Sequence, residues 1–596
     1  MAGRHWVPAL LLGLLLATPF AASEFQITLL NYIGLYSIVA VGLVLLTGVG
    51  GLMSFGQAAF VGLGAYATAY LCGGESIPAW LAFLAGSPWL GLLAGLLVTG
   101  VVAMLLAQLT LRLSGHYLPL GTIAWSISLY FLFGNLEFLG GHTGLSGIRP
   151  LSFFGFELRE GRYFFYLIWA IVLGAVWLTV SLLDSREGRA IRALKGGVVM
   201  AEAMGVDTSR SKIVVFMIAA FFASISGWLY AHLQRFVNPT PFSLYMSIEY
   251  LFMAVVGGAA HVWGALIGAG LITILKQWLQ DLLPRLLGAS GNFETIVFGV
   301  MMIFVLQRAR DGLWPILARL APRREVRQEV PTAAPLPKRA VPVRGEVLLE
   351  ARSVVKRFGG LVANNNMDLS VRAGEILALI GPNGAGKSTM FNCVSGVDQA
   401  TEGVVLFRGQ EVTRLNSREI ARLGMSRTFQ HVRLLPTMSV LENAAIGTHM
   451  RGNKGVVPAM LHLERAEEAC LLAEAARQVE RVGLAAAMFE SAGSLPLGQQ
   501  RTLEIARALC ADPSLLLLDE PAAGLRYMEK QALATLLRKL REEGMGILLV
   551  EHDMDFVMGL ADRVVVMEFG EKIAEGLPDE VQRNPAVIEA YLGGVD

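Results

Sequence analysis

Long apolar runs, separated by short polar or glycine-rich stretches, fill the first half of the chain. They lie at 6–22, 27–48, 53–72, 89–111, 118–136, 163–183, 212–233, 247–280 and 293–307. A helix needs about 20 apolar residues to cross the hydrocarbon core of a bilayer. The run at 247–280 is long enough to turn back on itself around residues 257–264. The pattern therefore predicts roughly eight to ten membrane-spanning helices.

Charged side chains are nearly absent from the beginning of this half. Between Phe25 and Leu111 the one formally charged side chain is Glu75. A charge at the centre of a bilayer costs about 2.5–3.5 kcal/mol on insertion scales. Such a long uncharged stretch is therefore expected to cross the membrane several times.

Small residues and one acid within these runs indicate how the spans pack. Glycines recur, as at Gly48, Gly62 and Gly64, and they allow close helix contacts and broken helices around a polar pathway. Glu249 stands near the start of a run. It either lines such a pathway or lies at the membrane interface.

The second half has a different pattern, in which short apolar runs end in glycine or acidic motifs. Residues 375–380, 515–518 and 546–550 have the length of buried strands. We therefore expect a multidomain chain with three parts. These are an all-α polytopic transmembrane domain at 1–318, a Pro- and Arg-rich linker at 319–346, and an α/β domain at 347–596.

Charge supports this division. Residues 1–346 hold 23 Lys and Arg against 16 Asp and Glu, and residues 347–596 hold 26 against 32. The charged share of the whole chain is 16%, whereas soluble domains carry about 25%. An ordinary cytosolic enzyme is thereby disfavoured. The net charge of +1 gives no reason to expect nucleic acid as a partner.

Basic residues predict the orientation of the spans, because loops rich in Lys and Arg stay in the cytoplasm. We therefore expect residues 139–162, one span before the first basic cluster, to lie outside. The first run also resembles a signal peptide, but we expect it to remain as an uncleaved span. The two cytoplasmic clusters are Arg186, Arg189, Arg192, Lys195, Arg210 and Lys212, and Arg308, Arg310, Arg319, Arg323, Arg324 and Arg327.

The linker at 319–346 is expected to be a semi-extended tether with little regular structure, because Pro-rich segments behave as spacers. Its basic residues, among them Lys338 and Arg339, are expected to lie near anionic lipid headgroups. The four cysteines, which show no CxxC spacing, are expected to be small buried apolar residues in a reducing compartment.

A phosphate-binding motif follows the first strand of the second half. Residues 381–389 read GPNGAGKST, which fits G-x-x-x-x-G-K-[ST] between a strand and a helix. Backbone N–H groups of such a loop close around phosphate oxygens. The lysine reaches the β- and γ-phosphates, and the following serine ligates Mg²⁺. The expected ATP-binding residues are Gly381, Asn383, Gly384, Gly386, Lys387, Ser388 and Thr389.

Two acids end the next strand-like run. Asp519 is suited to contact Mg²⁺, and Glu520 to orient or activate the attacking water. The third run ends just before His552, which is in a position to contact the γ-phosphate.

These residues resemble the ATP-binding cassette (ABC) ATPases along the whole of 347–596. The resemblance implies that Phe358 stacks on adenine, that Gln430 is the Q-loop residue and a Mg²⁺ ligand, and that His552 is the switch histidine. It also implies that Leu495, Gly498 and Gln499 of the signature motif contact the ATP of a second cassette.

Two motifs depart from the pattern of that family. Pro496 and Leu497 replace Ser and Gly of the general LSGGQ signature, and Arg526 stands where many cassettes have Asp. Because a signature serves the ATP bound to the partner, these changes are expected to weaken mainly one of two composite sites.

Further motifs resemble the branched-chain amino acid importers. In the ATPase half these are GQQR at 498–501, EPAAGL at 520–525 and VIEAYLG at 587–593. In the membrane half they are GLMSFGQAAF at 51–60 and GLSGI at 144–148. The resemblance implies a permease fused to its ATPase in the bacterial inner membrane, with a cytoplasmic cassette. It also implies a second permease, a second cassette and a periplasmic binding protein as partners.

The resemblance gives the basic loop at 184–212 a role. In these importers a short cytoplasmic helix of the permease docks into a cleft of the ATPase near its Q-loop. Residues 189–205 are the candidate for this coupling helix. A loop that only sets the topology remains an alternative.

Three other functions stay open. Related importers carry urea, short amides or aromatic acids, and no residue here specifies a side chain. An exporter half-transporter has the same domain order, but its long helices extend into charged cytoplasmic segments that residues 25–111 lack. A membrane-anchored ATPase that regulates without transporting is the third.

Overall fold

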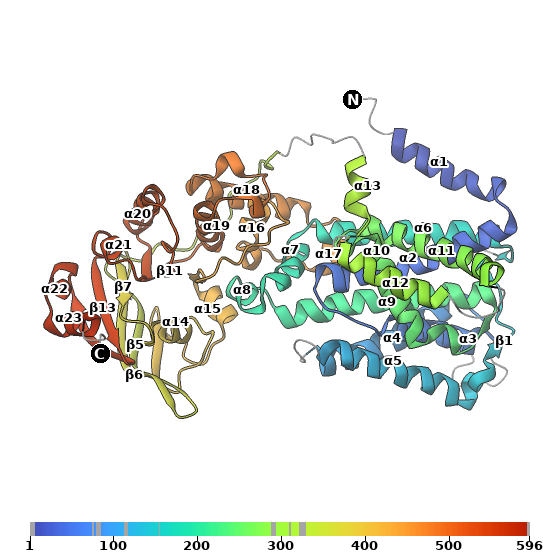
Figure 1. The fold of residues 1–596 in the computed structure, drawn as a ribbon, viewed down its shortest axis with the longest axis horizontal. Helices are drawn as coiled ribbons and strands as arrows, with labels where there is room; N and C mark the ends of the chain where they lie inside the picture. Colours follow the sequence, from blue (N-terminus) through green and yellow to red (C-terminus); the bar gives the residue numbers. More distant parts are fainter. Residues whose placement is uncertain are drawn as a thin grey trace. The chain divides into compact units, whose positions relative to one another are not determined.

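The computed structural model describes residues 6–73, 77–78, 85–111, 117–153, 155–287, 294–308, 312–320 and 329–592. The chain forms two compact units (Figure 1). Unit 1 consists of Met1–Leu182 and Ser209–Glu325, and unit 2 of Leu183–Thr208 and Val326–Asp596. Several residues named above lie outside the described ranges, namely Glu75, Arg310, Arg323, Arg324, Arg327 and Gly593.

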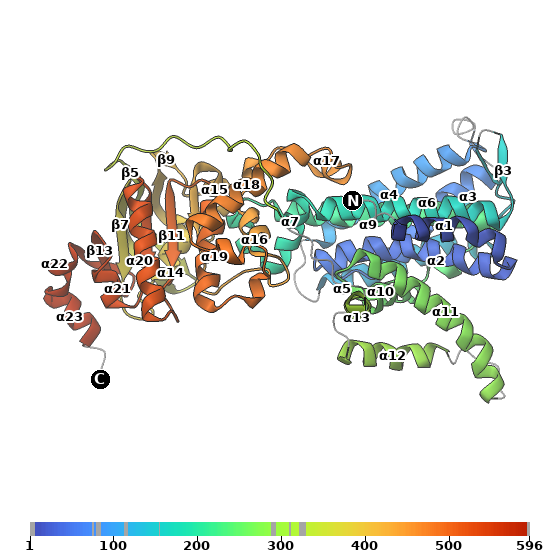
Figure 2. The same cartoon turned by 90° about the horizontal axis from the view of Figure 1, so that it is seen from above.

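Unit 1 is helical, as its apolar runs predict, and most of its helices run side by side in both views (Figure 2). Its helices are α1 (Trp6–Ala21), α2 (Glu24–Leu43) continued by the π-helix η1 (Val44–Val49), α3 (Gln57–Gly73), α4 (Pro88–Thr110), α5 (Tyr117–Asn135), α6 (Gly161–Leu183), α9 (Thr208–Gln234), α10 (Leu244–Gly258), α11 (Val262–Leu287), α12 (Glu294–Arg308) and α13 (Trp314–Leu320).

Six helices within the described ranges are long and apolar enough to cross a membrane. They are Glu24–Val49, Pro88–Thr110, Tyr117–Asn135, Gly161–Leu183, Thr208–Gln234 and Val262–Arg285. The other runs form α1, α3, α10 and α12, with 16, 17, 15 and 15 residues. These are shorter than the ~20 residues of a full span. These lengths count described residues only, so the expectation of eight to ten spans stays a prediction, and six described helices meet the length and composition criterion.

Helices α10 and α11 form the expected turn-back, and they touch through their backbones. A Cβ atom added to Gly257 would lie 1.8 Å from the carbonyl oxygen of Gly264. One added to Gly268 would lie 1.8 Å from that of Met253. Only glycine permits this approach, which confirms the close helix packing expected from the sequence.

Short strands mark one end of unit 1. β1 (Leu145–Ser146) pairs antiparallel with β4 (Phe236–Val237), and β2 (Leu151–Phe153) pairs with β3 (Phe156–Leu158). The β1–β4 pair joins the segment before α6 to the segment after α9. Both segments are expected on the outer side of the membrane, and the pairing places them at the same end.

Unit 2 is built on two sheets. The larger has the order β10-β11-β12-β7-β13-β14, and the smaller, antiparallel sheet has the order β6-β5-β8-β9. Their strands are β5 (Val347–Phe358), β6 (Leu361–Arg372), β7 (Ile376–Ile380), β8 (Glu402–Phe407), β9 (Gln410–Glu411), β10 (Met425–Arg427), β11 (Leu515–Asp519), β12 (Gly546–Val550), β13 (Arg563–Glu568) and β14 (Glu571–Gly576).

Helices accompany the sheets and complete unit 2. They are α7 (Arg186–Ala193), α8 (Val198–Ala203), α14 (Lys387–Val394), α15 (Ser417–Leu423), α16 (Val440–Ile446), α17 (Val456–Met460), α18 (Arg465–Arg481), α19 (Leu497–Leu509), α20 (Tyr527–Glu542), α21 (Met554–Met558), α22 (Pro578–Gln582) and α23 (Pro585–Leu592).

The larger sheet is buried on both faces. Strand β11 alternates between two apolar clusters: Leu515 and Leu517 face a cluster with α14 and the antiparallel sheet. Leu516 and Leu518 face a cluster with α19 and α20. Parallel strands covered on both faces read as continuous apolar runs, which is why β7, β11 and β12 could be recognised in the sequence.

The linker differs from the expected tether. Its described part, 329–346, has no helix or strand, as expected, but it lies against the ATPase. Val330 packs on the apolar cluster of α16, α18 and α19. The backbone N–H of Arg339 donates to Asp512 Oδ2 at 2.6 Å, and Arg451 donates to the carbonyl of Pro337 at 2.9 Å. The backbone of Arg339 is thus held by the ATPase, and the expected position of the linker's basic side chains near lipid headgroups stays a prediction.

The cysteines within unit 2 and α3 are free thiols. Cys72, Cys393 and Cys510 are buried, as the sequence predicts, and Cys470 is half-buried. Burial raises the pKa of the Cys393 thiol to about 11, which keeps it in the unreactive protonated form.

Candidate functional site

The phosphate-binding loop connects the fully buried strand β7 to helix α14. Gly381, Gly384 and Gly386 have positive φ angles of 152°, 84° and 95°, a region that favours glycine. A Cβ added to Gly386 would lie 2.3 Å from the carbonyl of Ala363, whereas Gly384 faces open space. The motif therefore forms a turn whose middle is accessible to a ligand.

Lys387 begins helix α14 and is 6% exposed. Its ammonium group donates to the carbonyl oxygens of Gly381 and Pro382 at 2.7 and 2.8 Å. Burial lowers the pKa of Lys387, and the carboxylates of Glu520 and Asp519 oppose this effect. The ammonium is thus held at the mouth of the loop, where phosphate oxygens would replace the carbonyls.

Asp519 ends β11, the strand separated from β7 by β12. Its side chain is buried, and its Oδ2 lies 3.8 Å from the guanidinium of Arg427. Burial raises the pKa of Asp519, and Arg427 opposes this effect. Oδ1 of Asp519 has no hydrogen-bond partner among the described residues. A buried carboxylate oxygen without a donor fits a Mg²⁺ ion, a hard cation with oxygen ligands.

The three expected catalytic residues meet at Glu520. Its Oε1 accepts hydrogen bonds from Gln430 Nε2 at 3.1 Å and from His552 Nε2 at 2.9 Å. Glu520 follows β11, Gln430 follows β10 and His552 follows β12. Because these parallel strands are neighbours, the sheet brings the three side chains to one edge.

A cavity of about 500 Å³ contains these groups. It lies over the phosphate-binding loop and ends at Phe358, whose ring has the Lys356 ammonium 4.7 Å from its centroid. The expected residues that line it are Phe358, Asn383, Gly384, Gly386, Lys387, Ser388, Thr389, Gln430, Glu520 and His552.

Two residues of this region were missed by the sequence analysis. Phe569, in the β13–β14 turn, lines the same cavity and is 86% exposed. Glu551 accepts from the backbone N–H of Ala522 at 2.5 Å and thereby fixes the loop after Glu520. Burial raises the pKa of Glu551. No motif in the sequence could have pointed to Phe569. Glu551 could have been found, because it follows an apolar strand-like run and directly precedes His552.

The signature residues do not line this cavity. Leu495 is buried, Gly498 is buried within α19 and Gln499 is exposed. Pro496 is the N-cap residue of α19, and Leu497 opens the helix with 46% exposure. Pro496 offers no side-chain cap, and no hydroxyl for a phosphate.

The comparisons match both halves of the chain. The model of the branched-chain amino acid transport system permease component matches residues 26–306. The ABC transporter model matches residues 364–523, and that of the branched-chain amino acid ATP-binding cassette transporter matches residues 571–596. The high-affinity branched-chain amino acid transport ATP-binding protein LivG of Escherichia coli strain K12 is 44% identical over 249 residues, which are 41% of this chain and 98% of LivG. The chain belongs to the branched-chain amino acid ABC transporter family.

Other similar proteins match the same region of this transporter. The high-affinity branched-chain amino acid transport ATP-binding protein BraF of Pseudomonas aeruginosa is 43% identical over 249 residues, 41% of this chain and 98% of BraF. A crystal structure of a nucleotide-free ATP-binding cassette from an ABC transporter is 32% identical, with a TM-score of 0.38, and covers 41% of this chain and 99% of that one. The transporter is a membrane protein that hydrolyses ATP and couples hydrolysis to transport.

The segment Leu183–Thr208 of the transporter packs on the ATPase and belongs to its compact unit. Its apolar side contributes Ala190, Ala193, Met200 and Met204 to a cluster with Phe429, Leu435, Met438 and Ile446. Phe429 directly precedes Gln430. The expected contact of residues 189–205 near the Q-loop is therefore confirmed, and it begins a few residues earlier than predicted.

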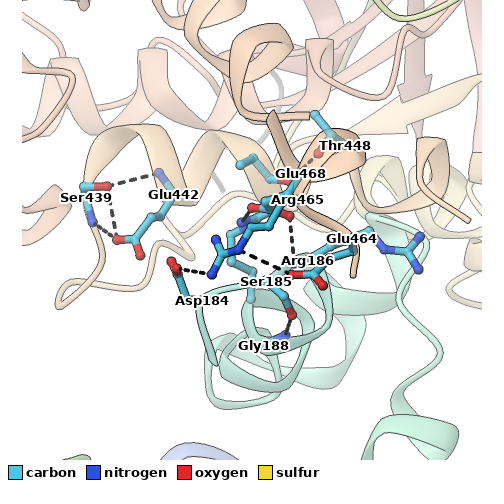
Figure 3. A network of polar contacts seen from close by, with 12 residues as sticks. Asp184, Ser185, Arg186, Gly188, Ser439, Glu442, Thr448, Glu464, Arg465 and Glu468 are labelled. Atoms are coloured by element: carbon cyan, nitrogen blue, oxygen red, sulfur yellow. Dashed lines mark hydrogen bonds and ion pairs between the residues drawn. The ribbon is translucent and has the colours of Figure 1, made fainter. Parts of the chain in front are cut away.

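Polar contacts fix the beginning of this docking segment (Figure 3). Ser185 caps α7 by accepting from the backbone N–H of Gly188. Arg189 pairs with Glu468 of α18, and the side chains are only 5% and 4% exposed. The backbone N–H of Arg186 donates to the same Glu468 carboxylate at 3.0 Å.

Further ion pairs lie around this buried contact. Asp184 pairs with Arg465 at 2.9 Å, Arg192 with Glu442 at 3.3 Å, and Asp207 with Arg418. These pairs are more exposed than Arg189 and Glu468. Exposed pairs are worth about 0–1 kcal/mol, so the apolar cluster contributes most of the docking. Loss of either partner of the buried pair would leave an uncompensated charge.

Proposed function

We propose that this transporter imports branched-chain amino acids across the bacterial inner membrane. The observation that carries the proposal is the presence of both matches in one chain. Residues 26–306 match the permease component, and the cassette is 44% identical to LivG, whose name describes branched-chain amino acid transport. A periplasmic binding protein delivers the substrate to the outer face.

ATP binds in the cavity above the phosphate-binding loop. Its phosphates replace the carbonyl oxygens at the Lys387 ammonium and accept from backbone N–H groups and from the N-terminus of α14. The adenine stacks on Phe358, which lines the same cavity. Asn383, Ser388 and Thr389 complete the phosphate contacts.

Glu520 orients and activates the water that attacks the γ-phosphate. Its carboxylate is the shared acceptor of Gln430 and His552, so these two side chains fix its direction. The His552 N–H that now contacts Glu520 is free to turn to the γ-phosphate when ATP is bound. Within this arrangement Glu520 is the base, and Gln430 and His552 are its partners.

Ser388, Gln430 and Asp519 would hold a Mg²⁺ ion that neutralises charge on the β- and γ-phosphates. The unpartnered Oδ1 of Asp519 supports this assignment.

A complete transporter contains a second permease and a second cassette. Leu495, Gly498 and Gln499 contact ATP bound to that second cassette, since they do not line the cavity of their own chain. Pro496 supplies neither a hydroxyl nor an N–H there, so the composite site that uses this signature is the weaker of the two.

The docking segment Leu183–Thr208 transmits the motion of the cassette to the permease. It touches Phe429, the neighbour of Gln430. A shift of Gln430 on ATP binding therefore reaches the apolar cluster beneath α7 and α8 directly.

An uptake assay tests the proposal. Cells that carry the wild-type chain or Lys387→Ala are given labelled leucine, urea or benzoate, and the uptake of each is measured. We expect leucine uptake that Lys387→Ala abolishes, because the cassette loses its phosphate-binding ammonium. Uptake of urea or benzoate in place of leucine would assign another substrate. Leucine uptake unaffected by Lys387→Ala would mean that the cassette does not drive import.

A further inference from the structure

Unit 1 contains an ion pair between α10, a short apolar helix, and α11, which is long and apolar enough to cross a membrane. Glu249 of α10 is 7% exposed, and both of its carboxylate oxygens accept from the Lys276 ammonium of α11, at 2.8 and 2.9 Å. Charges inside membrane-spanning segments are costly, and they typically mark a substrate or ion pathway. Nothing in the ATP cycle uses this pair.

The pair forms part of the wall of a cavity of about 320 Å³. Tyr32 and Tyr36 of α2 and Tyr230 of α9 line another part of it. This volume is at the lower end of the roughly 300–1,000 Å³ found for small-molecule sites. The cavity thus fits a small solute better than a lipid chain, and it combines aromatic faces with hydroxyl groups and a charge of each sign.

The aromatic wall is held in place by its own contacts. The rings of Tyr32 and Tyr36 are 5.8 Å apart, and Tyr36 meets Tyr250 edge to face at 5.6 Å. Gln234 donates to the hydroxyl of Tyr32. A wall fixed in this way keeps its shape when a ligand enters.

The cavity lies toward the end of unit 1 that is expected outside. Pro241, which also lines it, belongs to the short connection between α9 and α10. That connection includes β4, which pairs with β1 from the segment predicted to face outward. A solute released at the outer face therefore enters the permease near this cavity.

We propose that this cavity binds the zwitterionic head group of an α-amino acid during passage. Glu249 accepts from the α-ammonium and Lys276 donates to the α-carboxylate, while the tyrosine rings contact the side chain. Without substrate, the two residues neutralise each other. A zwitterion inserted between them replaces one ion pair by two and leaves the net charge of the cavity unchanged.

The inference rests on the proposed import of amino acids. It explains why the permease would favour amino acids over urea or aromatic carboxylates. A neutral solute such as urea satisfies neither charge. An aromatic carboxylate satisfies Lys276 but leaves Glu249 without a cation, and an uncompensated buried charge costs several kcal/mol. A molecule whose ammonium and carboxylate groups are attached to the same carbon atom provides a partner for both Glu249 and Lys276.

The decisive variant is the double change Glu249→Gln with Lys276→Gln. Single changes leave one buried charge uncompensated and fail whether the pair is structural or binds substrate. The double change removes both charges and keeps the side-chain sizes similar. The control is Glu24→Gln with Arg162→Gln, which removes a different ion pair of unit 1 whose side chains are 69% and 44% exposed.

The measurement is the maximal rate of leucine uptake by cells with each chain, normalised to the amount of chain in the membrane fraction. We expect a loss of about tenfold or more for the double variant, the scale of one lost hydrogen bond to a charged group. The control pair is expected to keep the wild-type rate. The melting temperature of the solubilised chains shows that the double variant is folded.

A wild-type rate in the double variant would overturn the inference, because the pair would then be structural. This outcome leaves the proposed function standing, since leucine is still imported. Absence of leucine uptake by the wild-type chain would instead contradict the proposed function itself.

Discussion

Glu520 combines an unusual backbone with a shared carboxylate. Its φ angle is +47°, a region that costs a non-glycine residue about 1–3 kcal/mol and clusters at functional sites. Its backbone N–H donates to the carbonyl of Val550 at 2.8 Å, which holds the strained turn in place. The fold therefore maintains one orientation of this side chain toward Gln430 and His552.

Replacement of this carboxylate is expected to stop turnover without preventing binding. In Glu520→Gln, we expect ATP hydrolysis to fall by about 10²–10⁴, the usual contribution of a general base. Nucleotide binding should persist because the phosphate-binding loop is untouched. Phosphate release and binding of a fluorescent ATP analogue by the solubilised transporter measure the two effects. Glu411→Gln, on the exposed strand β9, serves as the control, and equal hydrolysis by both variants would exclude the role of Glu520.

Two aromatic side chains are available for adenine. We expect Phe358→Ala to weaken ATP binding by about 1–3 kcal/mol, the value of one base–aromatic stack. Phe569→Ala is expected to have a smaller effect, because Phe569 is 86% exposed in a turn whereas Phe358 is supported by Lys356. Equilibrium titration of both variants with the same nucleotide shows which of the two rings contacts adenine. A larger loss for Phe569→Ala would reassign the adenine contact.

The sequence predicted the site residues best where the chemistry requires a fixed spacing between them. The phosphate-binding loop and the acids after β11 lie where the motif and the strand pattern predict. Phe569 was missed because a turn between two antiparallel strands has no spacing constraint. The partner of Asp519 was missed as well, since the contact with Arg427 depends on β10 and β11 being neighbours in the sheet.

At the level of elements, the docking segment belongs to one half of the chain by sequence and to the other by structure. Helices α7 and α8 interrupt the membrane half in sequence, yet they belong to unit 2 in the structure. The apolar side of these two helices is short, and the basic residues of the segment dominate its sequence pattern. The resemblance to the importers identified the contact, but the buried Arg189–Glu468 pair followed only from the structure.

This pair gives a prediction for coupling. Removing one partner of a buried ion pair costs about 3–5 kcal/mol. We therefore expect Arg189→Ala to uncouple the cassette, so that leucine uptake falls much more than ATP hydrolysis. Arg192→Ala, which breaks a pair whose side chains are 31% and 39% exposed, should keep most of the uptake. The ratio of leucine imported to ATP hydrolysed measures the difference, and equal ratios in both variants would contradict this role of Arg189.

The linker was predicted to be a semi-extended tether because its Pro-rich composition indicates stiffness and gives no sign of attachment to the ATPase. In the structure its described part is held by Val330, Pro337 and Arg339. Single backbone hydrogen bonds of this kind leave no pattern in the sequence.

At the scale of the molecule, one chain carries a permease and a cassette. The sequence predicted a helical membrane part followed by an α/β part, and this fold class is confirmed, whereas the boundary near residue 346 stays a prediction. The sequence did not predict that residues 183–208 belong to the ATPase unit, because contacts between distant segments are not local properties of sequence. Six described helices meet the length and composition criterion for a span, and apolar helices with 15 to 17 described residues leave the expected eight to ten spans a prediction.

The assembled transporter should hold more than this chain. Because the signature residues do not line their own cavity, we expect the purified complex to contain two cassettes and two permease units. Native mass spectrometry of the complex from its own host measures this composition. A chain that hydrolyses ATP at the full rate as a monomer would contradict the composite site.

The central claim is that ATP hydrolysis at Glu520 drives amino acid import by this transporter. Uptake of labelled leucine by cells with Glu520→Gln, compared with Glu411→Gln, tests it most directly. We predict near-complete loss of uptake with Glu520→Gln and the wild-type rate with Glu411→Gln, at equal amounts of chain in the membrane. Leucine uptake at the wild-type rate with Glu520→Gln would contradict the account.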